Sequence, residues 1–183
     1  MLRTLVWLSL GAFALGTEAF MIAGILPEIA GDLGVSIPLA GHLVTIFALT
    51  YALGAPLMAV ATASLPRKQL LIGALGAFAL ANLVAAVAPN YWLLALSRVL
   101  LALSAGTFMP AASGYAALTV TPEKRGRALS IVYAGMTVAM VIGVPLGTLL
   151  AEHLGWRATF AAVAALSALA LLGIALALPR VAN

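Results

Sequence analysis

The sequence predicts an all-α polytopic membrane protein with six transmembrane helices, folded as a single domain over residues 1–183. Composition is the first reason: 64% of the residues are hydrophobic and 8% are charged, against about 25% charged residues in average soluble domains. The second reason is a set of six apolar tracts, each near the length of roughly 20 residues that spans a bilayer. The third is that nearly all charges fall in the short connections between these tracts.

The expected helices follow from these tracts in chain order. They cover residues 5–26, 40–63, 70–88, 92–117, 128–150 and 158–178. The connections carry the turn-forming and charged residues and cover 27–38, 64–69, 89–91, 118–127 and 151–157. The first tract follows a single Arg3, as a secretory signal does, but it is about twice as long as a signal's apolar region and lacks an A-x-A cleavage pattern. We therefore expect a retained helix.

Charge asymmetry between the two sides predicts the orientation. If the tracts alternate across the membrane, one side receives seven basic residues, namely Arg3, Arg67, Lys68, Lys124, Arg125, Arg127 and Arg180. The other side receives a single basic residue, Arg157, together with Glu28, Asp32 and Glu152. Because basic residues concentrate in cytoplasmic connections, we expect both termini to be cytoplasmic.

The sequence also argues against several function classes. The formal net charge of +4 comes from short basic clusters, without the basic and aromatic stripe of a surface that binds nucleic acid. Cysteine is absent, and the only histidines, His42 and His153, lack metal-ligand spacing, so we expect no metal site. No combination of nucleophile, base and phosphate-binding loop indicates an enzyme.

Two ionisable residues, Glu18 and Arg98, lie inside apolar tracts and are the strongest indication of function. At a helical rise of about 1.5 Å per residue, Glu18 is expected about 12 Å and Arg98 about 9 Å from the same membrane surface. A charge near the bilayer centre costs about 2.5 to 3.5 kcal/mol, so both side chains should face the protein interior, a partner or water. Two alternatives stay open: Arg98 extends to the interface, or Glu18 is a neutral acid hydrogen-bonded in the core.

A carboxylate and a guanidinium at matching depth suit a proton-coupling device. Burial favours the neutral acid and a neighbouring guanidinium favours the carboxylate, so moving the two groups apart or together changes proton binding. Helical spacing places small and flexible residues around the pair, as a pliable substrate cavity requires. The candidate cavity residues are Ala14, Thr17, Met21, Ala105 and Met109, with ordinary core packing as the alternative.

The fifth tract is dense in small residues. It contains Gly135 and a Gly143-xxx-Gly147 pair that straddles Pro145. Close helix packing with a proline kink accounts for this pattern. A pivot between helices that must slide accounts for it equally, and both interpretations stay open at this point.

A weak internal echo joins the first and fourth tracts. Residues 16–21 read Gly-Thr-Glu-Ala-Phe-Met, and residues 106–109 read Gly-Thr-Phe-Met. Because these two tracts cross the membrane in opposite directions, the echo fits a three-plus-three inverted repeat of the kind found in transporters.

Motifs distributed over nearly the whole chain carry a family resemblance. They are residues 16–36, Arg98 with Gly106, Arg125-Gly-Arg127, Gly143-Val-Pro-Leu-Gly147 and Gly155-Trp-Arg-Ala-Thr-Phe160. Together they resemble the N-terminal six-helix half of a major facilitator superfamily transporter, in the drug and sugar efflux branch of bacterial proton antiporters. The resemblance implies a proton-coupling role for Arg98, an antiporter motif over 135–147 that favours the pivot, a cavity lined by the first and fourth helices, and a bacterial inner-membrane location. It implies protons as the coupling ion and no other cofactor.

One motif departs from the family pattern. The connection between the second and third helices usually carries Gly-x-x-x-Asp-Arg-x-Gly-Arg-Arg in this family. Here the first glycine falls on Ala59, the Asp-Arg pair on Ala63-Ser64, and the second glycine on Pro66. Only Arg67 and Lys68 remain in this cytoplasmic loop, so the resemblance does not predict the complete charge latch of that motif.

The superfamily alternates access with two six-helix halves, and 183 residues supply one of them. We expect either a truncated half or a natural half-size protein that pairs as a parallel homodimer, because the charge bias argues against opposite orientations. The leading hypothesis is proton-coupled efflux of a small organic solute. The competing hypothesis is a non-transporting six-helix membrane module whose embedded charges pair only structurally.

Overall fold

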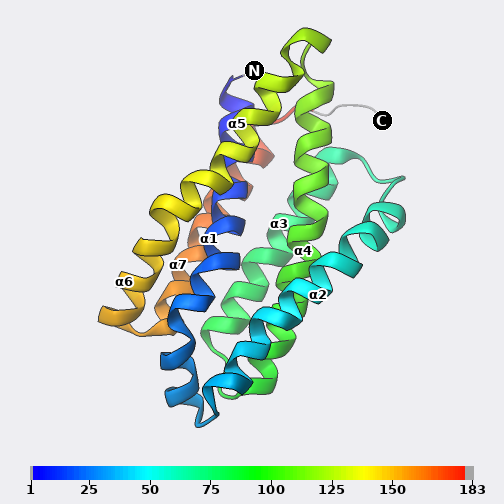
Figure 1. Cartoon of the computed structure of the whole chain (residues 1–183). Coiled ribbons are helices and arrows are strands. Elements are labelled where there is room, and N and C mark those ends of the chain that lie inside the picture. Colours follow the sequence, from blue (N-terminus) through cyan, green and yellow to red (C-terminus); the bar gives the residue numbers. More distant parts are fainter. Residues whose placement is uncertain (1, 180–183) are drawn as a thin grey trace.

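The computed structural model describes residues 2–179, and all regular secondary structure in that range is helical (Figure 1). The elements are α1 Leu2–Leu33, α2 Ile37–Ala61, α3 Arg67–Ala86, α4 Tyr91–Leu118, a 3-10 turn Pro122–Lys124, α5 Arg125–Val138, a π-helical segment Ala139–Gly143, α6 Val144–Leu154 and α7 Trp156–Ala177. Six spans are long and apolar enough to cross a membrane, the fifth running from the 3-10 turn to the end of α6. The predicted all-α class with six spans is confirmed.

The first helix is longer than the sequence predicts. The expected end at residue 26, just before Pro27, is wrong, because α1 continues through the proline to Leu33. Its buried face also continues, with Ile25 and Ile29 inside the bundle. The helix ends where Gly34 adopts a left-handed φ of 64°. Ser36 then begins α2 by accepting a hydrogen bond from the Leu39 amide at 3.3 Å.

The ends of the helices alternate as the sequence predicts (Figure 1). The start of α1, the α2–α3 connection and the α4–α5 connection lie at one end of the bundle, and the other three connections lie at the opposite end. The first end carries the basic cluster Arg3, Arg67, Lys68, Lys124, Arg125 and Arg127, whereas Arg180 lies outside the described residues. The cytoplasmic placement of that end and the inverted repeat stay predictions.

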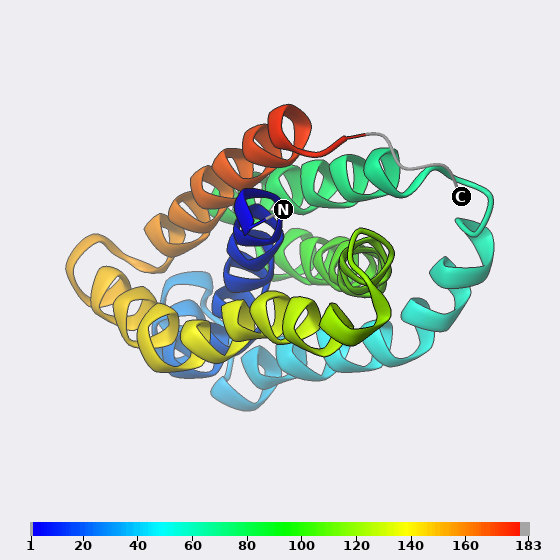
Figure 2. The same ribbon diagram turned by 90° about the horizontal axis from the view of Figure 1, so that it is seen from above.

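Helices α1 and α4 form the centre of the bundle, as the view from above shows (Figure 2). Helix α1 packs on α2, α4, α5, α6 and α7, and α4 packs on α2, α3 and α5. In the most apolar 18-residue stretch of each span, the buried share is 61% in α1 and 67% in α4. The corresponding share is 17% in α2 and 22% in the fifth span. The central helices therefore form the core of the bundle, whereas most of the surface of α2 and of the fifth span is not covered by other parts of this chain.

A polar cluster ties together the bundle end opposite the basic cluster. Arg157 at the start of α7 forms an ion pair with Asp32 and donates to the Ala88 carbonyl at 2.9 Å. The Trp156 indole donates to Asp32 at 3.1 Å. The central carbon of the Arg157 guanidinium lies 4.2 Å from the centroid of the Trp156 ring. This cluster joins α1, the α3–α4 connection and α7. It gives Asp32 and Arg157, which the sequence places on this side, a direct structural role.

The α1–α2 turn provides a first test of the fold. Replacing Gly34 with Ala should lower the free energy of unfolding by about 1 to 2 kcal/mol, because the left-handed conformation opposes a Cβ. Replacing Gly31, which is helical and has open space where a Cβ would lie, should be neutral or stabilising by up to about 1 kcal/mol. Unfolding in mixed detergent measures both. Equal effects of the two substitutions would show that the turn does not require its glycine.

Candidate functional site

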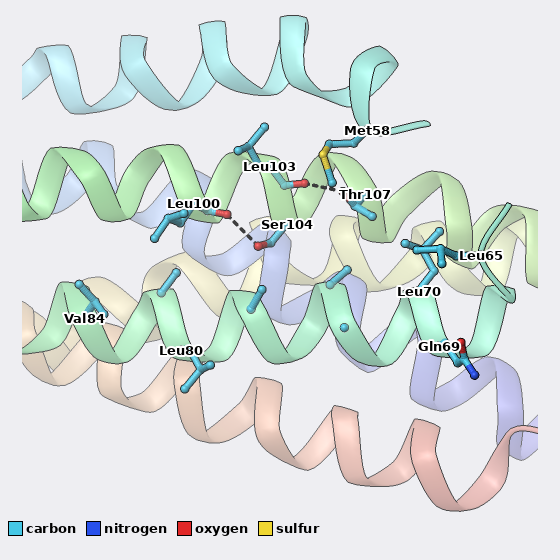
Figure 3. Close-up of a pocket in the computed structure, with 14 residues that line it drawn as sticks. Met58, Leu65, Gln69, Leu70, Leu80, Val84, Leu100, Leu103, Ser104 and Thr107 are labelled. Carbon is cyan, nitrogen blue, oxygen red and sulfur yellow. Dashed lines mark hydrogen bonds between the residues drawn. The ribbon is translucent and has the colours of Figure 1, made fainter. Parts of the chain in front are cut away.

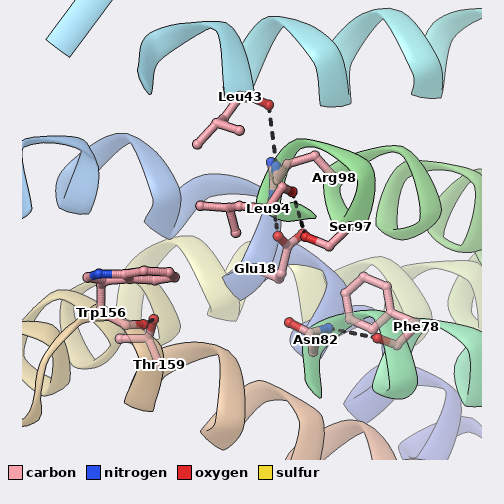
Figure 4. A network of polar contacts seen from close by, with 9 residues as sticks. All are labelled: Glu18, Leu43, Phe78, Asn82, Leu94, Ser97, Arg98, Trp156 and Thr159. Carbon is pink, nitrogen blue, oxygen red and sulfur yellow. Dashed lines mark hydrogen bonds and ion pairs between the residues drawn. The ribbon is translucent and has the colours of Figure 1, made fainter. Parts of the chain in front are cut away.

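The two embedded charges meet in the centre of the bundle (Figure 4). The Arg98 Nη1 group donates to Glu18 Oε1, and both side chains are 0% exposed. Glu18 comes from α1 and Arg98 from α4, the two most deeply buried spans. Complete burial excludes the alternative in which the arginine extends to the interface in this conformation.

The neighbouring residues on each helix explain why the charges point inward. Met21 and Ile22 on α1 are fully buried, and so are Leu94 and Leu101 on α4. Each charge therefore belongs to the same helical face as the apolar core residues of its span. A guanidinium only donates hydrogen bonds, so the Glu18 oxygen that it contacts must accept. An ionised carboxylate and the carbonyl oxygen of a neutral acid both meet this requirement, so the charge state of Glu18 stays open in this conformation.

Helix α2 supplies two further contacts to the guanidinium. The Arg98 Nε group donates to the Leu43 carbonyl at 3.3 Å, and the guanidinium carbon lies 4.4 Å from the centroid of the Phe47 ring. Arg98 thereby links α1, α2 and α4. Neither Leu43 nor Phe47 was predicted from the sequence, because a backbone acceptor leaves no sequence signal and a phenylalanine in an apolar tract reads as core.

The pair is incompletely satisfied. Among the described residues, Glu18 Oε2 and Arg98 Nη2 have no hydrogen-bond partner. Asn82 on α3 is also fully buried, and its side-chain nitrogen donates to the Phe78 carbonyl at 2.9 Å while its oxygen is unpaired in this part of the chain. As the only polar side chain in the third tract, Asn82 was visible in the sequence.

The glycines of the fifth span allow it to approach α1 closely. A Cβ at Gly135 would meet the backbone of Ser9, and one at Gly143 would meet Thr17. A Cβ at Gly147 would lie 3.1 Å from the sulfur of Met21. Pro145 lies in the first turn of α6, directly after the π-helical segment. The motif therefore packs against the helix that carries Glu18, and its role as a pivot stays a prediction.

The five candidate cavity residues are all buried in the bundle. Ala14 and Met21 are 0% exposed, and Thr17, Ala105 and Met109 are between 4% and 6% exposed. A groove of about 500 Å³ lies elsewhere, between α2, α3 and α4, and none of the five lines it (Figure 3). Ser104 and Thr107 in that groove donate to carbonyls of their own helix, so its surface is mainly apolar. A substrate cavity at the five residues stays a prediction.

The two basic residues expected in the cytoplasmic loop, Arg67 and Lys68, lie instead in the first turn of α3 and have different surroundings. Lys68 donates to the carbonyls of Ala175 at 2.8 Å and Leu178 at 2.5 Å, which places a positive charge at the C-terminal end of α7. Arg67 lies beside Gly114 of α4, and its Nε has no partner among the described residues. Although the usual acidic partner of this motif is missing from the sequence, Lys68 fixes α3 to α7.

The chain is similar to known membrane proteins over most of its length. Residues 8–182 match the family model described as Major Facilitator Superfamily. A chloramphenicol resistance protein of Streptomyces lividans is 44% identical over 94% of this chain and 44% of the relative. The inner membrane transport protein YdhP of Escherichia coli K12 is 39% identical over 96% of this chain and 45% of the relative. The chain thus spans about half the length of these curated relatives.

The fold of the chain is also similar to the folds of solved membrane transporters. The proton:xylose symporter XylE of the major facilitator superfamily superposes with a TM-score of 0.85 at 16% sequence identity, over 98% of this chain and 45% of the symporter. At that identity the match concerns the fold alone. The family resemblance read from the motifs is confirmed.

Removing one member of the buried pair at a time should have unequal effects. Glu18→Met leaves a buried guanidinium that keeps its charge, and we expect a loss of about 3 to 5 kcal/mol in the free energy of unfolding. Arg98→Met leaves a carboxyl that can take up a proton, so its loss should be smaller. The double variant should recover much of the loss. Unfolding in mixed detergent measures the cycle, and additive losses would contradict a direct interaction.

Close approach at Gly135 gives a separate prediction. Gly135→Ala should lower the free energy of unfolding by about 1 to 3 kcal/mol, because the added Cβ meets the backbone of α1 and cannot be relieved by a side-chain movement. Gly126→Ala, at the exposed start of the same helix, has no atom within 4 Å of its Cβ. This control should be neutral or slightly stabilising. Equal melting temperatures for the two variants would contradict the close packing.

Proposed function

Because the chain belongs to the major facilitator superfamily, we propose that it forms a six-helix half of a transporter that couples proton movement to export of small organic solutes of the drug or sugar type. The proposed location is the bacterial inner membrane, and protons are the only coupling species. The relative named as a chloramphenicol resistance protein supports an organic solute of this kind.

The buried Glu18–Arg98 pair is the observation that carries this proposal. A carboxylate held in a dry interior remains ionised while the guanidinium is beside it, and it binds a proton when the guanidinium withdraws. The two groups are on different helices and both are 0% exposed, so their separation depends on helix positions and not on solvent. Conformation then controls proton binding, which is the requirement for coupled transport.

A second six-helix body completes the proposed transporter. The outer surfaces of α2 and the fifth span are largely uncovered by this chain, with 17% and 22% of their apolar windows buried. We propose that this partner is the other half of a longer chain or a second copy in a parallel homodimer, and that the substrate passes between the two bodies. The glycine-rich contact of the fifth span with α1 would then be the sliding seam.

A non-transporting membrane module is the competing function. A single six-helix body offers no second wall for a gated cavity, so the assembly state separates the two proposals. If the chain transports as a pair of copies, crosslinking in native membranes should trap a product of twice the mass of the six-helix chain. A monomer under all crosslinking conditions would favour the module.

Glu18→Gln should abolish most gradient-driven transport, by at least about tenfold, because the amide cannot exchange a proton at the buried position. Radiolabelled chloramphenicol in inside-out vesicles with an imposed proton gradient is the probe, with the chain in its full assembly. Glu28→Gln makes the same change on the same helix in a partly exposed carboxyl and should retain transport. Full gradient-driven transport by Glu18→Gln would remove this residue from the proton-binding role.

A further inference from the structure

We propose that Phe47 and the Leu43 carbonyl form a second docking position for the Arg98 guanidinium, which holds the cation when Glu18 is protonated. Phe47 is then a positioning residue for proton exchange at Glu18. This inference rests on the proposed function, in which Glu18 is the proton-binding carboxylate.

The contacts of Arg98 divide into two groups. The Nη1 group faces Glu18 on α1. The Nε group and the flat face of the guanidinium are directed to α2, with the Leu43 carbonyl 3.3 Å from Nε and the Phe47 centroid 4.4 Å from the central carbon. The remaining Nη2 group has no partner in the described part of the chain. The guanidinium therefore lies between an acidic partner and a neutral one.

Proton binding at Glu18 creates a problem that the neutral partner solves. The carboxyl loses its charge when it takes up a proton, whereas an arginine keeps its charge under all physiological conditions. A buried guanidinium without its counter-ion is strongly unfavourable unless other groups replace the carboxylate. An aromatic face and a backbone carbonyl are such groups, and cation–π attraction is strongest where water is excluded. Arg98 is 0% exposed, so this condition holds.

The docking position also links protonation of Glu18 to the contacts that helix α2 makes. Leu43 is fully buried and Phe47 is half-buried on α2, the span with the smallest buried share of the six. The Phe47 ring stacks on the ring of Tyr51, one turn further along α2, with 6.2 Å between the centroids. This stacking helps to fix the orientation of the Phe47 ring. A shift of Arg98 from Glu18 toward this position would strengthen the contact between α4 and α2 at the expense of the contact between α4 and α1.

Few other titratable groups surround the pair. Tyr51 on α2 stacks on Phe47, and Tyr133 on α5 interacts electrostatically with Tyr51. His42 precedes Leu43 but is exposed. None of these has a hydrogen bond or ion pair to Glu18 or Arg98 among the described residues.

Carbodiimide labelling tests the proposal on the full chain without a known substrate. Dicyclohexylcarbodiimide reacts with the protonated carboxyl in an apolar site and rearranges to an N-acylurea that retains the whole reagent mass, so mass spectrometry gives the protonated fraction of Glu18 at each pH. Phe47→Leu should slow labelling by about threefold or more at the wild-type midpoint, because loss of the ring disfavours the state with neutral Glu18. The midpoint should move to lower pH.

Matched variants separate positioning from a general packing defect. Phe47→Tyr keeps the aromatic face and should label like the wild type. Phe20→Leu removes a 43% exposed ring from α1, two residues from Glu18, and should also label like the wild type. Phe47→Met keeps the volume without the ring and replaces Phe47→Leu in the comparison if circular dichroism shows that the leucine variant is unfolded.

The possible outcomes distinguish this inference from the proposed function. If wild-type Glu18 labels with a clear pH midpoint and the ring-less variants leave it unchanged, the docking position is wrong and the proton-binding role of Glu18 stands. If wild-type Glu18 does not label at any pH from 5 to about 9, the proton-binding role itself fails, and the docking position fails with it. A lowered midpoint confined to the ring-less variants supports both.

Discussion

The energetic penalty for placing charge in a low-dielectric interior is the constraint on which the rest of this bundle depends. Glu18 and Arg98 are 0% exposed, and each is tolerable there only because the other is present. Two helices far apart in the sequence must therefore pack with these positions facing each other. The central placement of α1 and α4 follows from that requirement, and the other four spans surround them.

The close packing around α1 has a second consequence. The fifth span approaches α1 through glycines, and its buried share is small because this contact uses a narrow stripe of its surface. Small residues give close approach without interlocking side chains, so such a contact leaves no room for added bulk. The structure thus combines a firmly held pair in the centre with a smooth contact at one side of the same helix.

The sequence predicted the six spans, their alternation and the inward orientation of both charges, because each follows from hydropathy or from the cost of an isolated charge. It predicted the end of α1 incorrectly, since Pro27 is tolerated inside a helix whose buried face continues to Ile29. It did not predict Phe47 or the Leu43 carbonyl as partners of Arg98. Such contacts depend on the rotation of α2 about its axis, and a helix that is apolar on all sides has no polar face to fix this rotation.

The chain contains two ion pairs between the described residues, and their surroundings decide which one can respond to conformation. Asp32 and Arg157 are 46% and 39% exposed, so water solvates both charges whether or not they touch, and such a pair contributes about 0 to 1 kcal/mol. Glu18 and Arg98 have no solvent to replace a lost partner. Their charge states are therefore tied to helix positions, while those of the outer pair are not. The proposed coupling between proton binding and movement requires charges that solvent does not reach, and the contact between α1, α2 and α4 meets this requirement.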